Sequence, residues 1–186
     1  DLLLGDGIQT VQATSDGVIW TSYFDEGIFG NYGWDNPLGA SGLVAWDARG
    51  SRLYEFEAKS GLEFMADCYA LNVASDADVW CYYYDSFPLV RVRRGQIDAV
   101  WKIPIHGSHA FAVSEGLALF QGGYNKSKTF HLLELQSGSK TRELAQVQIE
   151  DEHGNALGSA RIAARGSSIF MLNDTRLYRL DVEMAA

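Results

Sequence analysis

Short runs of alternating hydrophobic and polar residues, separated by turns rich in Gly, Asp and Ser, make up most of the chain. The runs are rich in β-branched and aromatic side chains, and no long segment has the period of about 3.6 residues that an amphipathic helix shows. The pattern therefore predicts an all-β fold. We expect strands near residues 9–14, 18–24, 42–47, 51–56, 68–74, 78–84, 89–93, 97–103, 108–113, 117–121, 129–135, 141–149, 160–165, 168–172 and 176–182.

The predicted strands fall into four sets, and each set opens with two strands joined by a short polar turn. The turns are SDG at 15–17, SDAD at 75–78, SEG at 114–116 and RGSS at 165–168. Small residues at such turns allow the positive φ that hairpins need. A large apolar residue follows at the same place in each set, and these residues are Trp20, Trp80, Leu119 and Phe170. A four-stranded unit recurring every 40–50 residues or so is typical of a β-propeller blade.

The first repeat carries a family resemblance. SDGVIW, followed by GLVAWDARGSRLYEF, resembles the repeat of two-component-regulator propellers and of streptogramin-lyase-like propellers, in which a D-G-x-[IL]-W strand precedes a strand ending in D-x-x-G. The matching residues are Asp16, Gly17, Ile19, Trp20, Leu43, Asp47, Gly50 and Tyr54. The second repeat matches in part, because Ala77 replaces the Gly and the segment LVRVRRGQIDAVW lacks the Asp. The resemblance implies a propeller fold. The His and acidic residues that act with magnesium in streptogramin lyases have no match here, so no site is transferred.

We expect one propeller-type domain over residues 1–186, with blades of antiparallel four-stranded sheets near 8–58, 66–104, 108–150 and 158–183. Four sets do not close the common ring of six to eight blades, and the last set lacks a fourth strand. We therefore expect this chain to be a portion of a larger propeller, completed by a further chain segment or by a second copy.

The net charge of −9 and the pI near 4.8 argue against nucleic acid and anionic membranes as partners, because both attract a surplus of Lys and Arg. Cationic ligands or divalent metals suit this charge better than these partners do, and the favoured alternative is simple solubility through like-charge repulsion. No apolar run reaches the roughly 18 residues of a membrane span. The first residue is Asp1 and not Met, so the sequence does not decide whether a targeting segment lies upstream.

The two cysteines, Cys68 and Cys81, are expected to be free. A hairpin that turns at 76–77 would place Cys81 opposite Asn72, about 13 Å from Cys68 along the strand, which is beyond the reach of a disulfide. Two half-buried free thiols favour a reducing compartment, and we expect a cytoplasmic protein.

Propeller topology sorts the connections of the chain between two faces. The connections on one face are short, whereas the other face collects longer loops, above all DEGIFGNYGWDNPLGAS at 25–41, and three of the four histidines, His106, His109 and His153. Long loops on a rigid scaffold are common sites of binding and catalysis. The candidate site residues are Asp25, Glu26, Trp34, Asp35, Asp85, His106, His109 and Tyr124.

Each candidate has a structural alternative. Asp25 and Asp85, expected at the ends of two strands, either hold a divalent cation together or cap the strand ends. The H-x-x-H pair of His106 and His109 suits a metal but lacks a specified third ligand. Trp34 is a candidate for ligand stacking, or it packs within its loop.

Two functional hypotheses follow. In the first, the chain is a binding scaffold without catalysis or an evident cofactor, and its loop-rich face engages a protein or a small molecule. In the second, it is a metal-assisted propeller lyase or hydrolase that uses Asp25, Asp85 and one of the three loop histidines. The fold itself does not decide between them.

Overall fold

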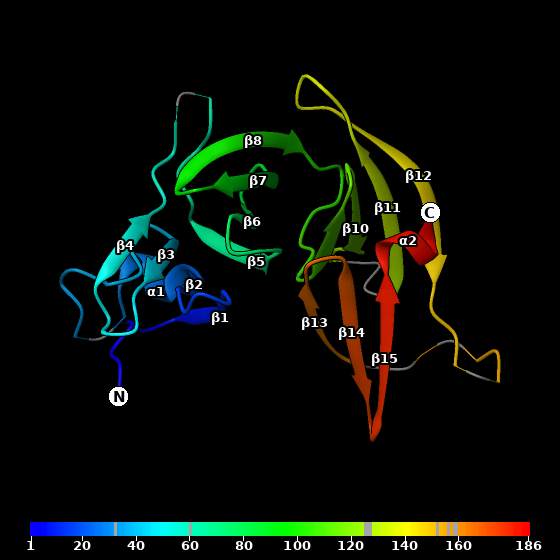
Figure 1. Cartoon of the computed structure of the whole chain (residues 1–186), viewed down its shortest axis with the longest axis horizontal. Coiled ribbons are helices and arrows are strands. Elements are labelled where there is room, and N and C mark those ends of the chain that lie inside the picture. Colours follow the sequence, from blue (N-terminus) through cyan, green and yellow to red (C-terminus); the bar gives the residue numbers. More distant parts are fainter. Residues whose placement is uncertain (32, 60, 125–127, 152, 156, 158–159) are drawn as a thin grey trace. The chain divides into compact units, whose positions relative to one another are not determined.

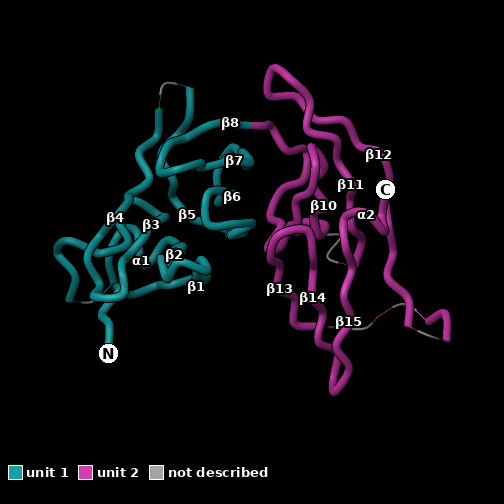
Figure 2. Tube along the Cα trace, in the orientation of Figure 1, with its two compact units in different colours: residues 1–100 teal, residues 101–186 magenta. Residues whose placement is uncertain are grey.

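The computed structural model describes residues 1–31, 33–59, 61–124, 128–151, 153–155, 157 and 160–186. It confirms the all-β prediction and has the β-propeller fold, with four antiparallel sheets as blades (Figure 1). The chain divides into two compact units, unit 1 over residues 1–100 and unit 2 over residues 101–186 (Figure 2). Neither of the two helices in the described residues is long and apolar enough to cross a membrane.

Unit 1 contains two four-stranded sheets. The first consists of β1 (Ile8–Ala13), β2 (Ile19–Tyr23), β3 (Leu43–Trp46) and β4 (Arg52–Glu55), in that order. The second consists of β5 (Asp67–Val73), β6 (Asp78–Tyr84), β7 (Pro88–Arg93) and β8 (Gln96–Lys102), whose last two residues run into unit 2. Each sheet is a meander, in which strands that follow one another in the chain pair side by side.

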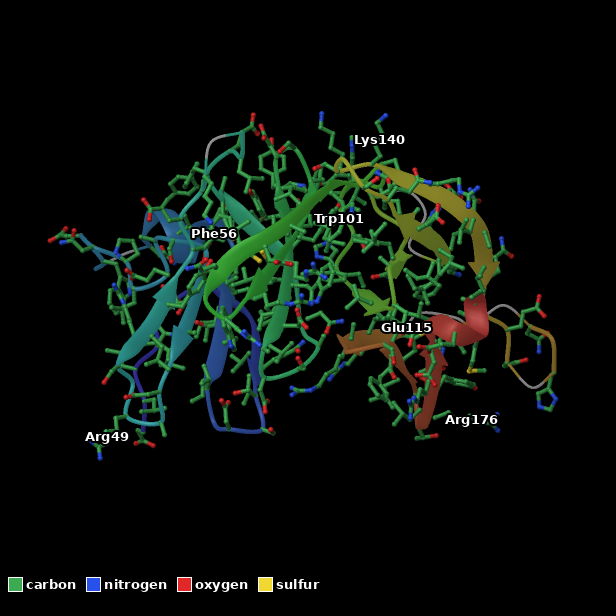
Figure 3. All side chains as sticks on the ribbon, turned by 45° about the horizontal axis from the view of Figure 1, so that its top comes forward. Arg49, Phe56, Trp101, Glu115, Lys140 and Arg176 are labelled. Atoms are coloured by element: carbon green, nitrogen blue, oxygen red, sulfur yellow. The ribbon has the colours of Figure 1, made fainter. Side chains whose placement is uncertain are left out.

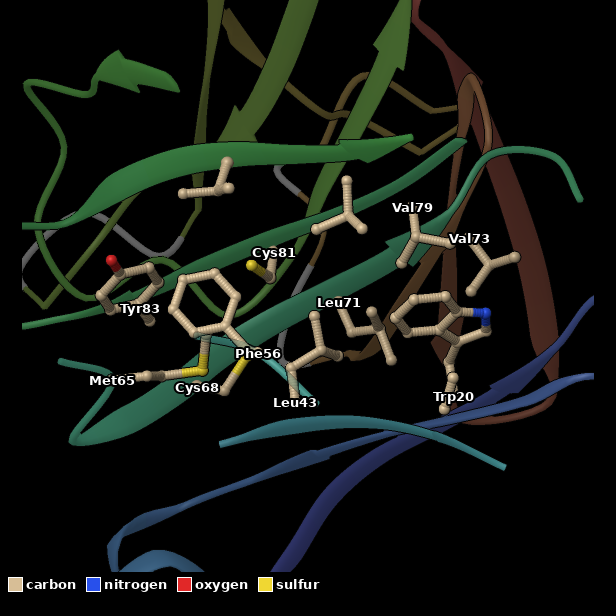
Figure 4. Close-up of a cluster of buried hydrophobic side chains, with 13 residues drawn as sticks. Trp20, Leu43, Phe56, Met65, Cys68, Leu71, Val73, Val79, Cys81 and Tyr83 are labelled. Carbon is tan, nitrogen blue, oxygen red and sulfur yellow. The ribbon is translucent and has the colours of Figure 1, made fainter. Parts of the chain in front are cut away.

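The two sheets of unit 1 pack through one hydrophobic cluster (Figure 4). The first sheet contributes Trp20 and Leu43, and β6 contributes Val79, Cys81 and Tyr83. These residues alternate along β6, as expected for a strand that turns one face to a neighbouring sheet. The fold of unit 1 therefore rests on the period-two pattern from which it was predicted.

Both cysteines are free, as predicted, but two details of that prediction were wrong. Cys81 lies opposite Leu71 and not opposite Asn72, because the hairpin turns over residues 75–78 and Trp80 takes the place opposite Asn72. Both thiols are fully buried and not half-buried. Burial raises the pKa of Cys68 to about 12 and that of Cys81 well above its usual value, so neither is a reactive thiolate.

Unit 2 holds a four-stranded and a three-stranded sheet. The former consists of β9 (Phe111–Ser114), β10 (Leu117–Gln121), β11 (Thr129–Leu135) and β12 (Thr141–Gln148). The latter consists of β13 (Arg161–Arg165), β14 (Ser168–Asn173) and β15 (Arg176–Asp181), followed by the short helix α2 (Val182–Ala185). Within the described residues this last sheet has no fourth strand, as the sequence predicted. A cluster that includes Leu119, Leu132, Ile169 and Met171 joins the two sheets.

The predicted repeat positions are equivalent in the structure. Trp20, Trp80, Leu119 and Phe170 all lie in the second strand of their sheets. Trp20, Trp80 and Leu119 are buried, and Phe170 is half-buried. The short turns carry exposed charged residues, among them Arg49 and Glu115, and the exposed Arg176 opens β15 directly after such a turn (Figure 3). The repeated apolar positions therefore serve to pack the second strand of each sheet.

Candidate functional site

The long loop after β2 begins with a helix and not with a strand end. Helix α1 (Asp25–Phe29) starts two residues after β2 ends at Tyr23, so the prediction that Asp25 ends a strand was wrong. The helix buries Gly27 and Ile28 and leaves Asp25, Glu26 and Phe29 exposed. It packs against β2 and β5, and thereby brings the loop of one sheet to the first strand of the next.

The segment before β1 packs on α1 at Gly27 and is tied to β2 by hydrogen bonds. A side chain at Gly27 would come within 2.4 Å of the carbonyl oxygen of Asp6, so the segment before β1 lies directly on the helix. The amide of Phe24 donates to the carbonyl of Gly7 at 3.0 Å. The indole of Trp46 donates to Thr21 Oγ1 at 2.7 Å, Thr21 donates to Tyr23 Oη at 2.9 Å, and Tyr23 donates to the carbonyl of Leu4.

Two aromatic side chains meet on the surface beside α1. The rings of Phe29 and Phe64 are 5.7 Å apart between centroids in an edge-to-face arrangement, although the residues are far apart in sequence. Phe29 is 63% exposed and Phe64 is 55% exposed. Large apolar side chains that pack on each other while facing water often mark an interaction site.

Carboxylates lie on the segments that carry these rings and at the neighbouring strand ends. Glu63 precedes Phe64 and forms a side-chain hydrogen bond with Asp85, which follows β6; this bond and the Asp85 charge raise the pKa of Glu63. Asp67, the first residue of β5, lies near Asp25 of α1, and burial together with the Asp25 charge raises its pKa to about 6. The exposed Tyr84 pairs with Asp67 across β5 and β6. We name this set the aromatic–acidic surface: Asp25, Phe29, Glu63, Phe64, Asp67, Tyr84 and Asp85.

The raised pKa of Asp67 has a consequence for stability. In the unfolded chain its carboxyl titrates near 3.8, so the folded state holds the proton more tightly. The stability from this carboxyl is fully present below about pH 4 and is lost as the pH rises through about 6. We expect Asp67→Asn to flatten the pH dependence and to raise the free energy of unfolding at pH 8 by about 1 kcal/mol after allowance for solvent screening. Urea unfolding at pH 4 and pH 8 measures this.

The control is Asp35→Asn, which removes an exposed carboxylate outside the surface. Equal changes in the free energy of unfolding for Asp67→Asn and Asp35→Asn at both pH values would contradict a raised pKa of Asp67 in the folded state.

The other predicted residues of the 25–41 loop lie near α1 or further along the loop. Glu26 is on the helix and accepts a hydrogen bond from Asn31 Nδ2 at 3.4 Å. Trp34 is half-buried, its amide donates to the carbonyl of Asn31, and Asp35 next to it is exposed. Residue 32 of this loop lies outside the described residues.

The remaining candidates belong to unit 2, where the structure brings two of them together. The amide of Tyr124 donates to the carbonyl of His106 at 3.1 Å, and its ring lies against Gly107, where a side chain would come within 2.5 Å of it. His106, His109 and Tyr124 are all exposed. His153 lies in a turn in which Asp151 accepts from the amides of His153 and Asn155.

Among the described residues, no group of three or more His, Cys, Asp or Glu is arranged to hold a metal ion. The divalent cation considered for Asp25 and Asp85, and the metal pair considered for His106 and His109, stay predictions.

Charge is distributed unevenly along the chain. Residues 1–100 contain 15 Asp and Glu against 6 Lys and Arg, whereas residues 101–186 contain 9 of each. The net charge of −9 therefore belongs to unit 1, the unit that carries the aromatic–acidic surface.

Sequence reasoning found Asp25 and Asp85 but missed Phe29, Glu63, Phe64, Asp67 and Tyr84. One signal was available. The segment 56–66 connects the last strand of one sheet to the first strand of the next, and by propeller topology such connections share a face with the 25–41 loop. Glu63 and Phe64 lie in that segment, and the contact of Phe64 with Phe29 is visible only in the folded chain.

Comparison with known proteins gives a family and several structures. The family described as the YxzG family matches residues 42–180. No curated protein matches the chain. Citrobacter koseri AztD has 11% identity and a TM-score of 0.49, over 96% of this chain and 45% of the AztD chain. A functionally unknown protein from Desulfotomaculum acetoxidans DSM 771 has 11% identity and a TM-score of 0.43, over 94% of this chain and 65% of that one.

The computationally designed Ika8 protein has 12% identity and a TM-score of 0.38, over 94% of this chain and 58% of that one. The chain thus spans less than two thirds of the length of each of these structures. The resemblance to two-component-regulator and streptogramin-lyase-like repeats stays a prediction beside the family match.

Proposed function

The chain belongs to the YxzG family, and we propose that it is a binding scaffold that engages a segment of a partner protein at the aromatic–acidic surface of unit 1. The observation that carries this proposal is the contact between Phe29 and Phe64, two rings that are each more than half exposed. A scaffold function needs no catalytic group, and no observation here favours the metal-assisted alternative.

The surface has the properties of a preformed anchor. Phe29 projects from a helix whose position is fixed by Gly27, and Phe64 is followed by Met65, which is 1% exposed in the core of unit 1. Both rings are therefore held by buried neighbours, so a partner would lose little entropy in ordering them. Aromatic side chains of this kind are frequent among the residues that dominate binding energy.

The open geometry favours a protein segment over an enclosed small molecule. Phe29, Phe64 and Tyr84 are 63%, 55% and 44% exposed, so they offer an area that another surface would cover. Small-molecule sites, in contrast, usually enclose most of the ligand.

Panning a displayed library of random peptides against the whole chain tests the proposal. We expect the enriched peptides to lose at least tenfold in affinity when Phe64→Ser replaces the wild type, because about 1.4 kcal/mol of anchor burial corresponds to that factor. Leu177→Ser is the matched control, since Leu177 is a 68% exposed apolar residue of unit 2. Near-UV circular dichroism verifies that both variants fold. Failure to enrich any peptide, or equal affinity for wild type and Phe64→Ser, would refute the proposal.

A further inference from the structure

We infer that the partner segment presents an arginine or lysine side chain to the aromatic–acidic surface, where its cation lies over the rings of Phe29 and Phe64 and between the surrounding carboxylates. This inference rests on the proposed function and names the chemistry of its partner. Three observations support it: the carboxylates without basic partners, their mutual closeness, and a recurring arrangement of arginine in this chain.

The carboxylates of the surface lack basic partners within the part of the chain that the structure describes. Asp25, Glu63, Asp67 and Asp85 take part in none of its ion pairs. Elsewhere in unit 1 the fold does pair its acids, since Arg52 meets Glu55, Arg91 meets Asp98 and Arg93 meets Asp78. The surface is thus a place where acidic side chains gather without basic partners.

The fold also brings these like charges together. Glu63 and Asp85 are in hydrogen-bond contact, and Asp25 and Asp67 are close enough for one charge to act on the other. Like-charged carboxyl groups at close range are unfavourable unless a proton or a cation lies between them. A basic side chain from a partner that lies beside either pair would relieve its repulsion.

The chain itself shows how it accommodates an arginine. The guanidinium of Arg91 lies 5.3 Å from the ring centroid of Trp80 and pairs with Asp98. The guanidinium of Arg52 lies 5.5 Å from the ring of Trp46 and pairs with Glu55. In both cases an aromatic face and a carboxylate hold one cation, a combination that suits arginine in particular.

The aromatic–acidic surface has aromatic rings and carboxylates, as these two places do, but it contains no arginine. Phe29 and Phe64 supply the rings, and Asp25, Asp67, Glu63 and Asp85 supply the carboxylates. A divalent metal would use only the carboxylates and would leave the rings without a role. An arginine or lysine uses both, and its aliphatic stem covers apolar area.

The test uses peptides from the panning experiment that depend on Phe64. In each peptide, one arginine at a time is replaced with citrulline, which keeps the shape of the side chain and removes its charge, and each lysine is replaced with acetyl-lysine. Fluorescence polarisation then measures affinity. We expect at least one such replacement in every peptide to weaken binding tenfold or more.

A double variant of the protein, Asp67→Asn with Asp85→Asn, is expected to show the same loss. Asp174→Asn, which removes an exposed carboxylate from the turn between β14 and β15 in unit 2, is expected to retain wild-type affinity. Thermal melting of each variant verifies folding.

The outcomes separate the two proposals. Peptides that need Phe64 and lose binding on citrulline or acetyl-lysine replacement support both. Peptides that need Phe64 but contain no basic residue, or tolerate these replacements, overturn the inference about the cation and leave the proposed function intact. If no peptide depends on Phe64, the proposed function fails, and this inference fails with it.

Discussion

Replacement of Trp20 with alanine is expected to lower the free energy of unfolding by about 3–5 kcal/mol, the usual loss for a large aromatic side chain removed from a core. Trp20 is 6% exposed and packs 5.3 Å, centroid to centroid, from the ring of Tyr54. It also belongs to the cluster that joins the two sheets of unit 1, together with Val73 and Val79 of the neighbouring sheet. Its loss would leave a cavity between two rigid sheets, which collapse only in part. Urea unfolding followed by far-UV circular dichroism measures the change.

The matched control is Trp34→Ala, which removes the same side chain from a half-buried place in the 25–41 loop. We expect it to lower the free energy of unfolding by less than about 1.5 kcal/mol, since partial burial leaves less area to lose. Equal losses in the two variants would contradict the interpretation of Trp20 as a structural element of the repeat.

The second large effect is expected for Gly27→Ala. The added methyl group would lie 2.4 Å from the Asp6 carbonyl oxygen and 2.8 Å from that of Gly7, and backbone atoms cannot rotate away. We expect a loss of about 1–3 kcal/mol, as for other overpacked sites. Because the helix must then move, Phe29 would move away from Phe64, and the affinity for the selected peptides should fall together with stability. Urea unfolding and fluorescence polarisation report the two effects.

Glu26→Ala is the control for this prediction, because it places alanine on the same helix at an exposed position. Its effect on stability is expected to stay within about 0.5 kcal/mol. A wild-type melting curve for Gly27→Ala would show that the segment before β1 does not press on α1.

Most of the fold could be predicted from local pattern. Every strand of the structure has a predicted counterpart within a few residues. Short β-branched and aromatic runs bounded by polar turns mark both the half-buried strands, such as β1, and the strands buried on both faces, such as β6. The exceptions are informative. Helix α1 has only five residues, which is too short to display a helical period. The register of Cys81 was misplaced by one residue, because the exact turn of the 75–78 hairpin decides it and several turns suit the same sequence.

The candidate site was predictable only in part. Asp25 and Asp85 could be found because each follows an aromatic strand in its repeat. Phe64 could not be joined to Phe29 in the same way, since their contact depends on how the connection between two sheets passes the helix. Contacts of this kind arise from tertiary packing and leave no period in the sequence.

The concentration of the net charge in residues 1–100 has a kinetic consequence. A basic partner would be drawn by long-range attraction toward the half of the chain that carries its binding surface, while the neutral half would contribute no net attraction. Steered encounters of this kind raise association rate constants from roughly 10⁵–10⁶ M⁻¹s⁻¹ toward 10⁸ M⁻¹s⁻¹ at low ionic strength. Added salt should therefore slow the arrival of the partner more than it hastens its departure, because ions screen attraction across solvent strongly and screen short-range contacts in the partly buried bound state much less.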